Sequence, residues 1–170
     1  MAEQKYAIEV EGITKRFGDV VANDSISLNV KKGEILALLG ENGSGKTTLM
    51  NMLSGIYKPD GGIIKIAGQE VTITTPEDSK RLHIGMVHQH FKLVDKFSAA
   101  DNIWISAEKT GAFLTKDRYK KIDDICKKFG FDLDPKKLVS DMSVSEKQTV
   151  EIIRVLYRGA DILILDEPTA

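Results

Sequence analysis

The fold is decided by the stretch ILALLGENGSGKTT, residues 35–48. Its first five residues, Ile35–Leu39, are all apolar, as is typical of a strand buried on both faces of a parallel sheet. The next eight match the pattern G-x-x-x-x-G-K-[ST], and a helix is predicted from about Lys46 to Ser54, ended by Gly55. Glycines let backbone N–H groups close around phosphate, and a helix N-terminus favours anions. The stretch therefore predicts a nucleotide site; the alternative is a glycine turn before an ordinary helix.

The fixed positions of this loop each have a chemical role. Lys46 supplies a positive charge for the β- and γ-phosphates, and the hydroxyl of Thr47 is placed to ligate magnesium. We therefore expect ATP with Mg²⁺ as the ligand. The residues expected to bind the nucleotide here are Gly40, Asn42, Gly43, Ser44, Gly45, Lys46, Thr47 and Thr48.

A second apolar run, Ile162–Leu165, ends in two acids, Asp166 and Glu167. Parallel strands present ligands at their carboxyl ends, so these acids are expected near the phosphate loop. Asp166 suits the magnesium shell, and Glu167 suits a general base that orients the attacking water. Many strands end in acids, so the pair gains its meaning only together with the phosphate loop.

The composition fits one soluble domain. The chain has 170 residues, 42% of them hydrophobic, and a formal net charge of −1, which gives no general attraction for nucleic acid. Neither apolar run approaches the roughly 18 residues that a membrane helix needs, and the N-terminus has no apolar signal region. We expect a cytoplasmic protein whose membrane role comes through a partner. Cys126, the single cysteine, is expected in the core.

The remaining elements complete an α/β pattern interrupted by helices. Strands are expected around 6–10, 26–30, 63–66 and 84–87, and helices at 101–107, 117–129 and 145–158. Gly130 is a plausible stop for the second helix, and Ser145 with Gln148 fits a capping box for the third. We predict a nucleotide-binding core at 1–90, a helical subdomain at 91–159 and a returning strand at 160–170.

Together these motifs resemble the ATP-binding cassette (ABC) ATPases over the entire chain. The resemblance implies a P-loop NTPase core with an antiparallel β edge and a helical subdomain, here ending just after the Walker B acids. Phe17 stands where that family stacks an aromatic ring on adenine, although a simple strand-end aromatic is the alternative. Gln89 stands where the family's Q-loop glutamine reaches magnesium and the attacking water. Catalytic roles are thus implied for Lys46, Gln89 and Glu167, and magnesium ligation for Thr47, Gln89 and Asp166.

The segment MSVSE, residues 142–146, occupies the place of the family's signature motif, usually Leu-Ser-Gly-Gly-Gln. In a sandwich dimer, that motif contacts ATP held by a second cassette. The resemblance therefore implies that Ser143, Val144, Ser145 and Glu146 face a partner's nucleotide. Val144 and Ser145 replace the two glycines, and Lys147 and Thr149 also depart from the pattern. A degenerate ATP site is an alternative that this departure leaves open.

Within the family, residues 88–94, HQHFKLV, look like the importers for simple sugars and nucleosides. That likeness implies permease subunits and, indirectly, an extracellular solute-binding protein as partners, with nucleoside preferred as the solute. The chain would sit at the inner face of the membrane, on the permease. Phe91, Phe97 and Trp104 are candidate permease contacts or, equally, packing residues of the helical insertion. His88 and His90 belong either to a surface loop or, less readily, to a metal site.

The family pattern continues beyond Ala170 with another strand and a histidine. We therefore expect an N-terminal fragment of a first cassette, in which Ile35–Leu39 lacks a neighbouring strand. Such a chain would fold with a disturbed sheet or pair with a second copy, and hydrolyse ATP poorly.

Two other functions compete with an importer ATPase. One is a cassette protein without a transporter that acts mechanically on ribosomes or DNA; the near-neutral charge and the Gln89 segment argue against it. The other is a small-molecule kinase with the same phosphate loop; the signature-like segment and Asp166-Glu167-Pro168 argue against that.

Overall fold

The computed structural model describes residues 6–89, 91–105 and 115–167. The chain forms two compact units, Met1–Ile84 and Gly85–Ala170. None of the helices in the described ranges has both the length and the apolar character needed to cross a bilayer.

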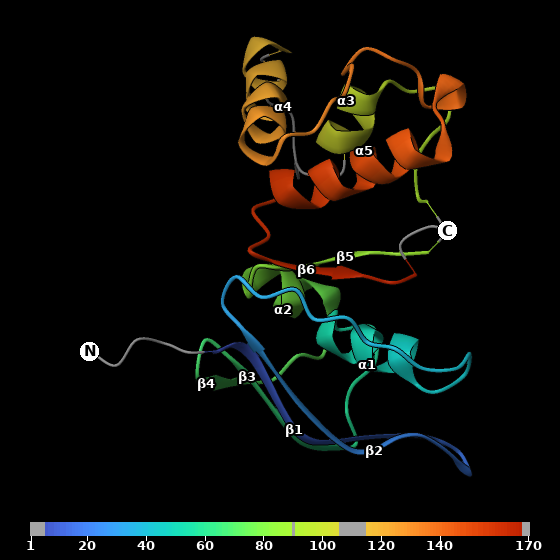
Figure 1. The fold of residues 1–170 in the computed structure, drawn as a ribbon, viewed down its shortest axis with the longest axis vertical. Coiled ribbons are helices and arrows are strands. Elements are labelled where there is room, and N and C mark those ends of the chain that lie inside the picture. The colour runs from blue at the N-terminus through green and yellow to red at the C-terminus, as the bar shows by residue number, and fades with distance from the viewer. Residues whose placement is uncertain (1–5, 90, 106–114, 168–170) are drawn as a thin grey trace. The chain divides into compact units, whose positions relative to one another are not determined.

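The N-terminal unit is built on a four-stranded antiparallel sheet (Figure 1). Its strands are β1 (Tyr6–Phe17), β2 (Val20–Lys31), β3 (Gly61–Ile66) and β4 (Gln69–Val71), in the order β2-β1-β3-β4. A two-residue turn joins β1 to β2, and Gly18 supplies the left-handed conformation that such a turn favours, with φ at 58°. Val10 and Ile13 of β1 and Ile64 of β3 are buried, which gives this sheet its core side.

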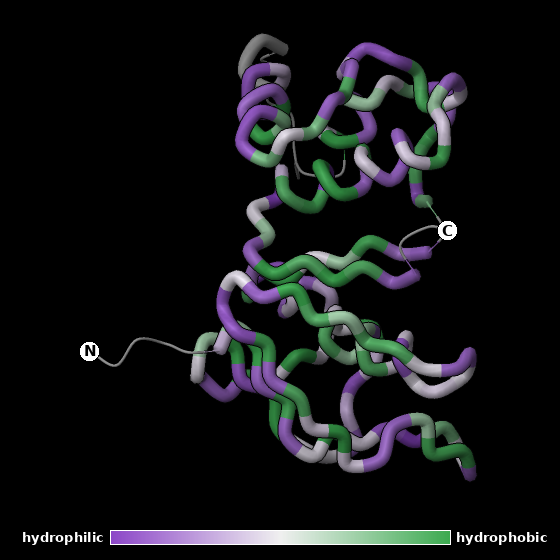
Figure 2. The backbone as a smooth tube through the Cα atoms, viewed as in Figure 1, coloured by the Kyte–Doolittle hydropathy of each residue, from purple (hydrophilic) through white to green (hydrophobic). Residues whose placement is uncertain are grey.

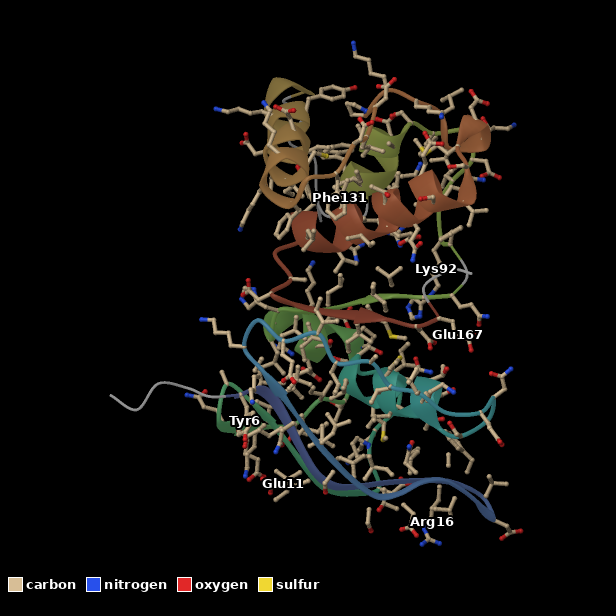
Figure 3. The ribbon with its side chains drawn as sticks, viewed as in Figure 1. Tyr6, Glu11, Arg16, Lys92, Phe131 and Glu167 are labelled. Carbon is tan, nitrogen blue, oxygen red and sulfur yellow. The ribbon has the colours of Figure 1, made fainter. Side chains whose placement is uncertain are left out.

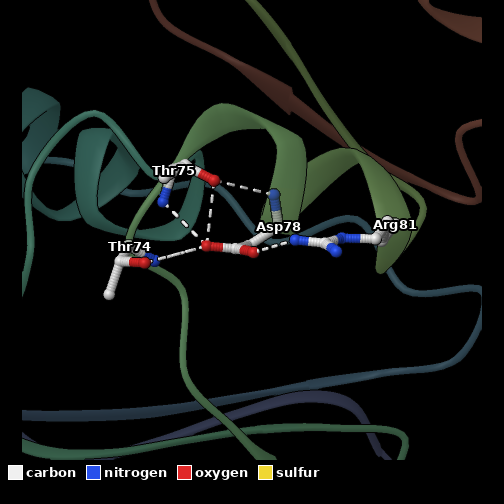
Figure 4. Close-up of polar contacts among 4 residues, drawn as sticks. All are labelled: Thr74, Thr75, Asp78 and Arg81. Atoms are coloured by element: carbon white, nitrogen blue, oxygen red, sulfur yellow. Dashed lines mark hydrogen bonds and ion pairs between the residues drawn. The ribbon is translucent and has the colours of Figure 1, made fainter.

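Two helices accompany the sheet, α1 (Lys46–Leu53) and α2 (Pro76–Arg81). The predicted start of α1 at Lys46 is confirmed, and its Leu49, Met52 and Leu53 are buried. Helix α2, which was not predicted from the sequence, begins at a capping box. Figure 4 shows the Asp78 carboxylate accepting hydrogen bonds from Thr74 and Thr75 and pairing with Arg81. These bonds, led by the Thr74 N–H, lower the pKa of Asp78.

The predicted strand at Ile35–Leu39 is wrong for this structure. Residues 34–41 carry no helix or strand, and Ile35 and Leu39 are 98% and 93% exposed. The hydropathy colouring in Figure 2 marks this segment as apolar. A strand needs a partner for its N–H and C=O groups, and no strand in the described part of the chain pairs with these residues.

The C-terminal unit combines a strand pair with a helical bundle. The strands are β5 (Ile84–Val87) and β6 (Ile162–Leu165), and the helices are α3 (Ala99–Ile105), α4 (Thr115–Phe129), the 3₁₀ turn η1 (Val139–Asp141) and α5 (Val144–Tyr157). The N–H of Asp166 donates to Val87 O at 3.1 Å. Because each residue lies at the carboxyl end of its strand, the two strands run in the same direction.

The bundle encloses its own apolar core. Ala99, Ile103, Ile122, Cys126, Val139, Val150, Ile153 and Tyr157 form it. The core position predicted for Cys126 is confirmed, and burial raises the pKa of its thiol. Gly130 ends α4 with φ at 72°, as predicted, and the N–H of Phe131 donates to Cys126 O.

Three helix starts differ from the predictions, and one of them is α4, which begins at Thr115 and not at Asp117. The capping box of α5 is formed by Ser143 with Glu146, not by Ser145 with Gln148. Helix α3 begins at Ala99, not Asp101, because the Ser98 hydroxyl accepts from the Asp101 N–H and places the cap earlier. The last two residues of that predicted helix, 106–107, lie outside the described ranges.

Candidate functional site

The side chain of Lys46 folds back onto the main chain of the phosphate loop. The Lys46 ammonium donates to Gly40 O and Glu41 O, both at 2.8 Å, and lies 3.4 Å from Ser44 Oγ. Because Lys46 is the first residue of α1, the loop curls back over the start of that helix. The contacts of this ammonium are with neutral oxygens, so its positive charge is suited to receive a phosphate.

Gly45 is the tightest point of the loop. It has φ at 89°, and a Cβ there would lie 2.2 Å from Ala22 O. The carboxamide of Asn23 donates to Gly45 O at 3.2 Å, so β2 supports the point where the loop enters α1. Asn23 is only 5% exposed. Sequence reasoning missed this residue, since the contact spans 22 positions and no motif records it.

The other predicted nucleotide residues surround this point. Gly40, Asn42, Gly43 and Ser44 are exposed, as is Thr47, while Thr48 is half-buried. Phe17 lies at the end of β1 and is 43% exposed. Its ring packs edge-on against Tyr57, with 5.1 Å between the ring centroids. Tyr57 follows α1, is half-buried and was not singled out in the sequence, so the exposed Phe17 ring rests on a second, partly covered ring.

In the C-terminal unit, the residues after β5 and β6 converge on a small pocket. Its lining is Val87, His88, Gln89, Phe91, Gln148, Leu165, Asp166 and Glu167. Gln89 Nε2 donates to Glu167 Oε2 at 2.6 Å, which brings together two residues 78 positions apart. The parallel strands thus unite the predicted Gln89, Asp166 and Glu167, all of them at the carboxyl edge.

The two acids differ in their surroundings. Asp166 is 8% exposed, whereas Glu167 is exposed and has φ at 45°. The left-handed conformation is unfavourable for a residue with a side chain, and such strain is common at functional sites. Beside them, burial lowers the pKa of His88, and the positive charge of Lys92 lowers it further. His90 lies outside the described residues.

The signature-like residues lie at the start of α5. Ser143 Oγ accepts from the Glu146 N–H, and Glu146 Oε2 accepts from the Ser143 N–H at 2.8 Å. Lys137 Nζ donates to Glu146 Oε1 at 2.7 Å. Lys137 and the Ser143 N–H together lower the pKa of Glu146 to about 2. Val144 is 57% exposed, and Ser145 is exposed beside it.

The candidate permease contacts have mixed surroundings. Phe97 is 38% exposed, while Phe91 and Trp104 are half-buried, and Phe91 lines the pocket described above. Gln148, which the sequence suggested as a cap partner, lines that pocket instead.

The donor groups suit a hard divalent cation. Thr47 offers a hydroxyl, Gln89 an amide oxygen, and Asp166 a carboxylate, and Mg²⁺ takes oxygen ligands of these kinds. Each of the latter two lines the C-terminal pocket. Within the ranges that the structure describes, no cluster of three or more His, Cys, Asp or Glu side chains forms a metal site of the all-protein kind.

Curated relatives share this sequence at high identity. The chain is 51% identical over 168 residues to the guanosine import ATP-binding protein NupO of Bacillus subtilis, covering 98% of this chain and 33% of that protein. It is 52% identical over 165 residues to the nucleoside import ATP-binding protein NupA of Lactococcus lactis, covering 96% and 33%. The ribose import ATP-binding protein RbsA of Caldanaerobacter subterraneus is 43% identical over 167 residues, covering 96% and 34%. The chain thus spans about a third of the length of these relatives.

Solved structures share the fold. The chain matches cbiO1 from Clostridium perfringens, part of the ABC transporter complex cbiONQ, with a TM-score of 0.83 and 30% identity, covering 98% of this chain and 67% of that one. The ADP conformation of the ATP-binding cassette MJ1267 matches with a TM-score of 0.83 at 24% identity, covering 97% and 70%. The ABC transporter family matches residues 23–170, a range that contains both the phosphate loop and the Asp166-Glu167 pair. The chain therefore belongs to the ABC transporter family.

Proposed function

We propose that this chain is the ATP-binding part of an ABC importer that hydrolyses Mg-ATP to drive uptake of a nucleoside or a sugar. The observation that carries the proposal is the phosphate loop, with its Lys46 ammonium seated on two loop carbonyls at the start of α1. A nucleoside is the preferred solute because the relatives named for guanosine and nucleoside import are more similar to this chain than the one named for ribose.

In this proposal the described residues divide the work. Gly40, Asn42, Gly43, Ser44, Gly45, Lys46, Thr47 and Thr48 hold the triphosphate, and Phe17 stacks on adenine. Glu167 orients the attacking water, and its hydrogen bond with Gln89 fixes the direction of the carboxylate. Residues 1–90 serve as the nucleotide-binding core, 91–159 as the helical subdomain and 160–170 as the returning strand.

Thr47, Gln89 and Asp166 are the proposed magnesium ligands, because each offers an oxygen donor. Bound magnesium would offset the negative charge of the phosphate oxygens. The buried carboxylate of Asp166 is suited to that part, since its N–H is already tied to Val87 O and its main chain is thereby fixed.

Two kinds of partner follow from the family. A second cassette would present its nucleotide to Ser143, Val144, Ser145 and Glu146 in a sandwich dimer. The ATP-binding cassette MJ0796 has been solved as a dimer with ADP and phosphate, which supports this arrangement. Permease subunits would hold the cassette at the cytoplasmic face of the membrane, and an extracellular solute-binding protein would act through them. Nucleic acid is not a proposed partner.

Calorimetric titration of the 170-residue chain with Mg-ATP tests the phosphate loop. Lys46→Ala removes the charge that the triphosphate needs, and we expect it to weaken binding by about two orders of magnitude. Lys58→Ala, which removes an exposed lysine outside the loop, is the matched control. Equal binding by the wild type and the Lys46→Ala variant would refute the proposed site.

Solute choice needs a second experiment. In cells that carry the full-length protein and its permease, uptake of radiolabelled guanosine and of ribose is compared with and without Lys46→Ala. We expect guanosine uptake to depend on Lys46. Dependence of ribose uptake alone would reverse the preference, and co-purification with ribosomes instead of a permease would favour the mechanical-switch alternative.

A further inference from the structure

The main chain just after Gln89 is held by side chains, not by a neighbouring strand. The N–H of Lys92 donates to Glu151 Oε1 at 2.8 Å, and Lys92 O accepts from Arg154 Nη1 at 2.8 Å. Val94, two residues after Lys92, is held in the same way by Asn102. The Val94 N–H donates to Asn102 Oδ1 at 2.7 Å, and Val94 O accepts from Asn102 Nδ2 at 3.1 Å. Lys92 and Val94 therefore receive from side chains the pair of bonds that a strand receives from its neighbour.

The groups that hold Lys92 are mutually paired, and the carboxylate of the pair is deeply buried. Glu151 is 3% exposed, and the Arg154 side chain, 14% exposed, forms an ion pair with it. Burial lowers the pKa of Arg154. A buried ion pair adds little to stability compared with apolar residues of the same size. Stability alone therefore does not account for the Glu151–Arg154 pair, whose further contacts are its two hydrogen bonds to the main chain of Lys92.

One face of α5 makes three contacts with β5 and the residues that follow it. Gln148 lines the pocket of Gln89 and Glu167. Glu151, three residues after Gln148, accepts from the Lys92 N–H, and Val155 packs on β5. Val155 can approach because position 85 is glycine, where a Cβ would lie 2.0 Å from Val155 Cγ1. The 148–151–155 spacing is that of a single helix stripe. Figure 3 labels Lys92 and Glu167 at the same end of the β5–β6 pair.

We propose that Glu151 and Arg154 are positioning residues for Gln89, acting through the main chain of Lys92. The described main chain is fixed at Val87, whose O accepts the Asp166 N–H, and again at Lys92, which is held by α5. Gln89 lies between those fixed points, so its 2.6 Å contact with Glu167 depends on both. This inference rests on the proposed ATP hydrolysis, and it extends that proposal by assigning α5 the task of aligning Gln89.

The decisive experiment compares two neutral replacements of the pair in the full-length protein. Glu151→Gln with Arg154→Gln retains an acceptor for the Lys92 N–H and a donor for its C=O. Glu151→Leu with Arg154→Leu fills similar volume without either bond. We expect the Leu pair to lower kcat for ATP by about tenfold or more with KM little changed, and the Gln pair to stay within about twofold of wild type.

A double-mutant cycle separates positioning from folding. If the pair acts through Gln89, the Leu pair lowers kcat in the wild-type background but not in the Gln89→Ala background. Melting temperatures of all variants report folding, and amide exchange at Lys92 in the 170-residue chain reports the two backbone bonds directly. Exchange at Lys92 should be fast in the Leu pair and slow in the Gln pair. Lys120→Ala, which removes an exposed side chain of α4 away from these contacts, is the control for an unaltered kcat.

The outcomes are distinguishable. Wild-type kcat in the Leu pair, or an equal loss with and without Gln89, would overturn the positioning role while leaving the proposed ATPase intact. If the Leu pair does not fold, the Gln pair provides the test. Slow amide exchange at Lys92 in the Gln pair would show that both backbone bonds are kept, and a tenfold lower kcat in that variant would then also overturn the positioning role. A wild-type protein that does not turn over Mg-ATP at all would overturn the proposed function, and this inference with it.

Discussion

Gln89 Nε2 lies 2.6 Å from Glu167 Oε2, so two polar residues that follow different strands share a hydrogen bond. The amide nitrogen faces the carboxylate, and Gln89 Oε1 is left for a second partner. Because a carboxylate only accepts hydrogen bonds, this contact fixes which end of the Gln89 carboxamide points toward Glu167. The strained main chain of Glu167 is held in place where that contact is made.

Changing these two residues should separate turnover from binding. Glu167→Gln keeps an acceptor for Gln89 but removes the basic oxygen, so we expect ATP turnover of the full-length protein to fall by about 10²- to 10³-fold. Gln89→Ala should cost roughly tenfold. Mg-ATP affinity, measured by calorimetry, should stay within a factor of about three for both, since the proposed triphosphate contacts lie in residues 40–48. A loss of affinity equal to the loss of turnover would contradict these roles.

Two glycines of the phosphate loop provide a matched pair. Gly45 and Gly43 both have left-handed φ, at 89° and 83°, but only at Gly45 would a Cβ meet other atoms, at 2.2 Å from Ala22 O. Alanine at either position should cost about 1 kcal/mol in backbone strain. We expect Gly45→Ala to cost about 1–3 kcal/mol more, because β2 would have to move.

Urea unfolding of the two variants measures this difference. Equal free energies of unfolding would show that the Ala22 contact yields without cost. Mg-ATP binding provides a second readout, in which Gly45→Ala should lose more affinity because the start of α1 shifts with the loop.

The phosphate loop was predictable because its information is local. The glycines and Lys46 fix the turn and the start of α1 within eight residues, and the structure places both as expected. Gln89, Asp166 and Glu167 meet because parallel strands align their carboxyl ends. The apolar run Ile162–Leu165 indicated this edge for the two acids, whereas the part of Gln89 was implied only by the family resemblance. The support from Asn23 and the contacts of Glu151 and Arg154 with Lys92 span 22 to 62 positions, and no local pattern contains them.

The start of α5 shows where local information is ambiguous. Both Ser143 with Glu146 and Ser145 with Gln148 fit the capping pattern, so spacing alone does not choose between them. The Lys137 ammonium, which lies outside the helix, pairs with Glu146 and so favours the cap formed by Ser143 with Glu146. The run Ile35–Leu39 was misjudged for a related reason: apolarity favours a strand, but only a partner strand completes one.

Serine substitutions test the corrected cap. Ser143→Ala removes the acceptor of the Glu146 N–H, and we expect it to lower the free energy of unfolding by about 1 kcal/mol. Ser145→Ala, two residues along on the exposed side of α5, should change it by less than about 0.5 kcal/mol. Chemical denaturation of both variants measures this, and the reverse ranking would restore the cap suggested by the sequence.

The acid side of the stability profile should depend on Glu146. Its pKa is lowered from 4.5 to about 2, first by Lys137 and then by Ser143. A depressed carboxyl pKa stabilises the folded chain above the unfolded value, so the contribution is complete above about pH 4.5 and is lost as pH falls toward 2. Glu146→Gln should therefore flatten the loss of stability in that window. Lys137→Ala should move the loss to higher pH, and melting scans from pH 2 to 6 follow both; identical profiles would contradict the Lys137 contact.

The exposed run Ile35–Leu39 should tolerate charge where the core does not. Ile35 is 98% exposed, so Ile35→Lys removes no buried surface and should change the free energy of unfolding by less than about 0.5 kcal/mol. Ile64 of β3, 4% exposed, is the contrast, and Ile64→Ala should cost about 2–5 kcal/mol.

Exposed apolar residues with unpaired backbone groups also favour association between chains. Ile35→Lys with Leu39→Lys should therefore reduce any self-association seen by size-exclusion chromatography of the 170-residue chain. A cost of several kcal/mol for Ile35→Lys would instead mean that this run is buried in solution, by a strand or by a second copy.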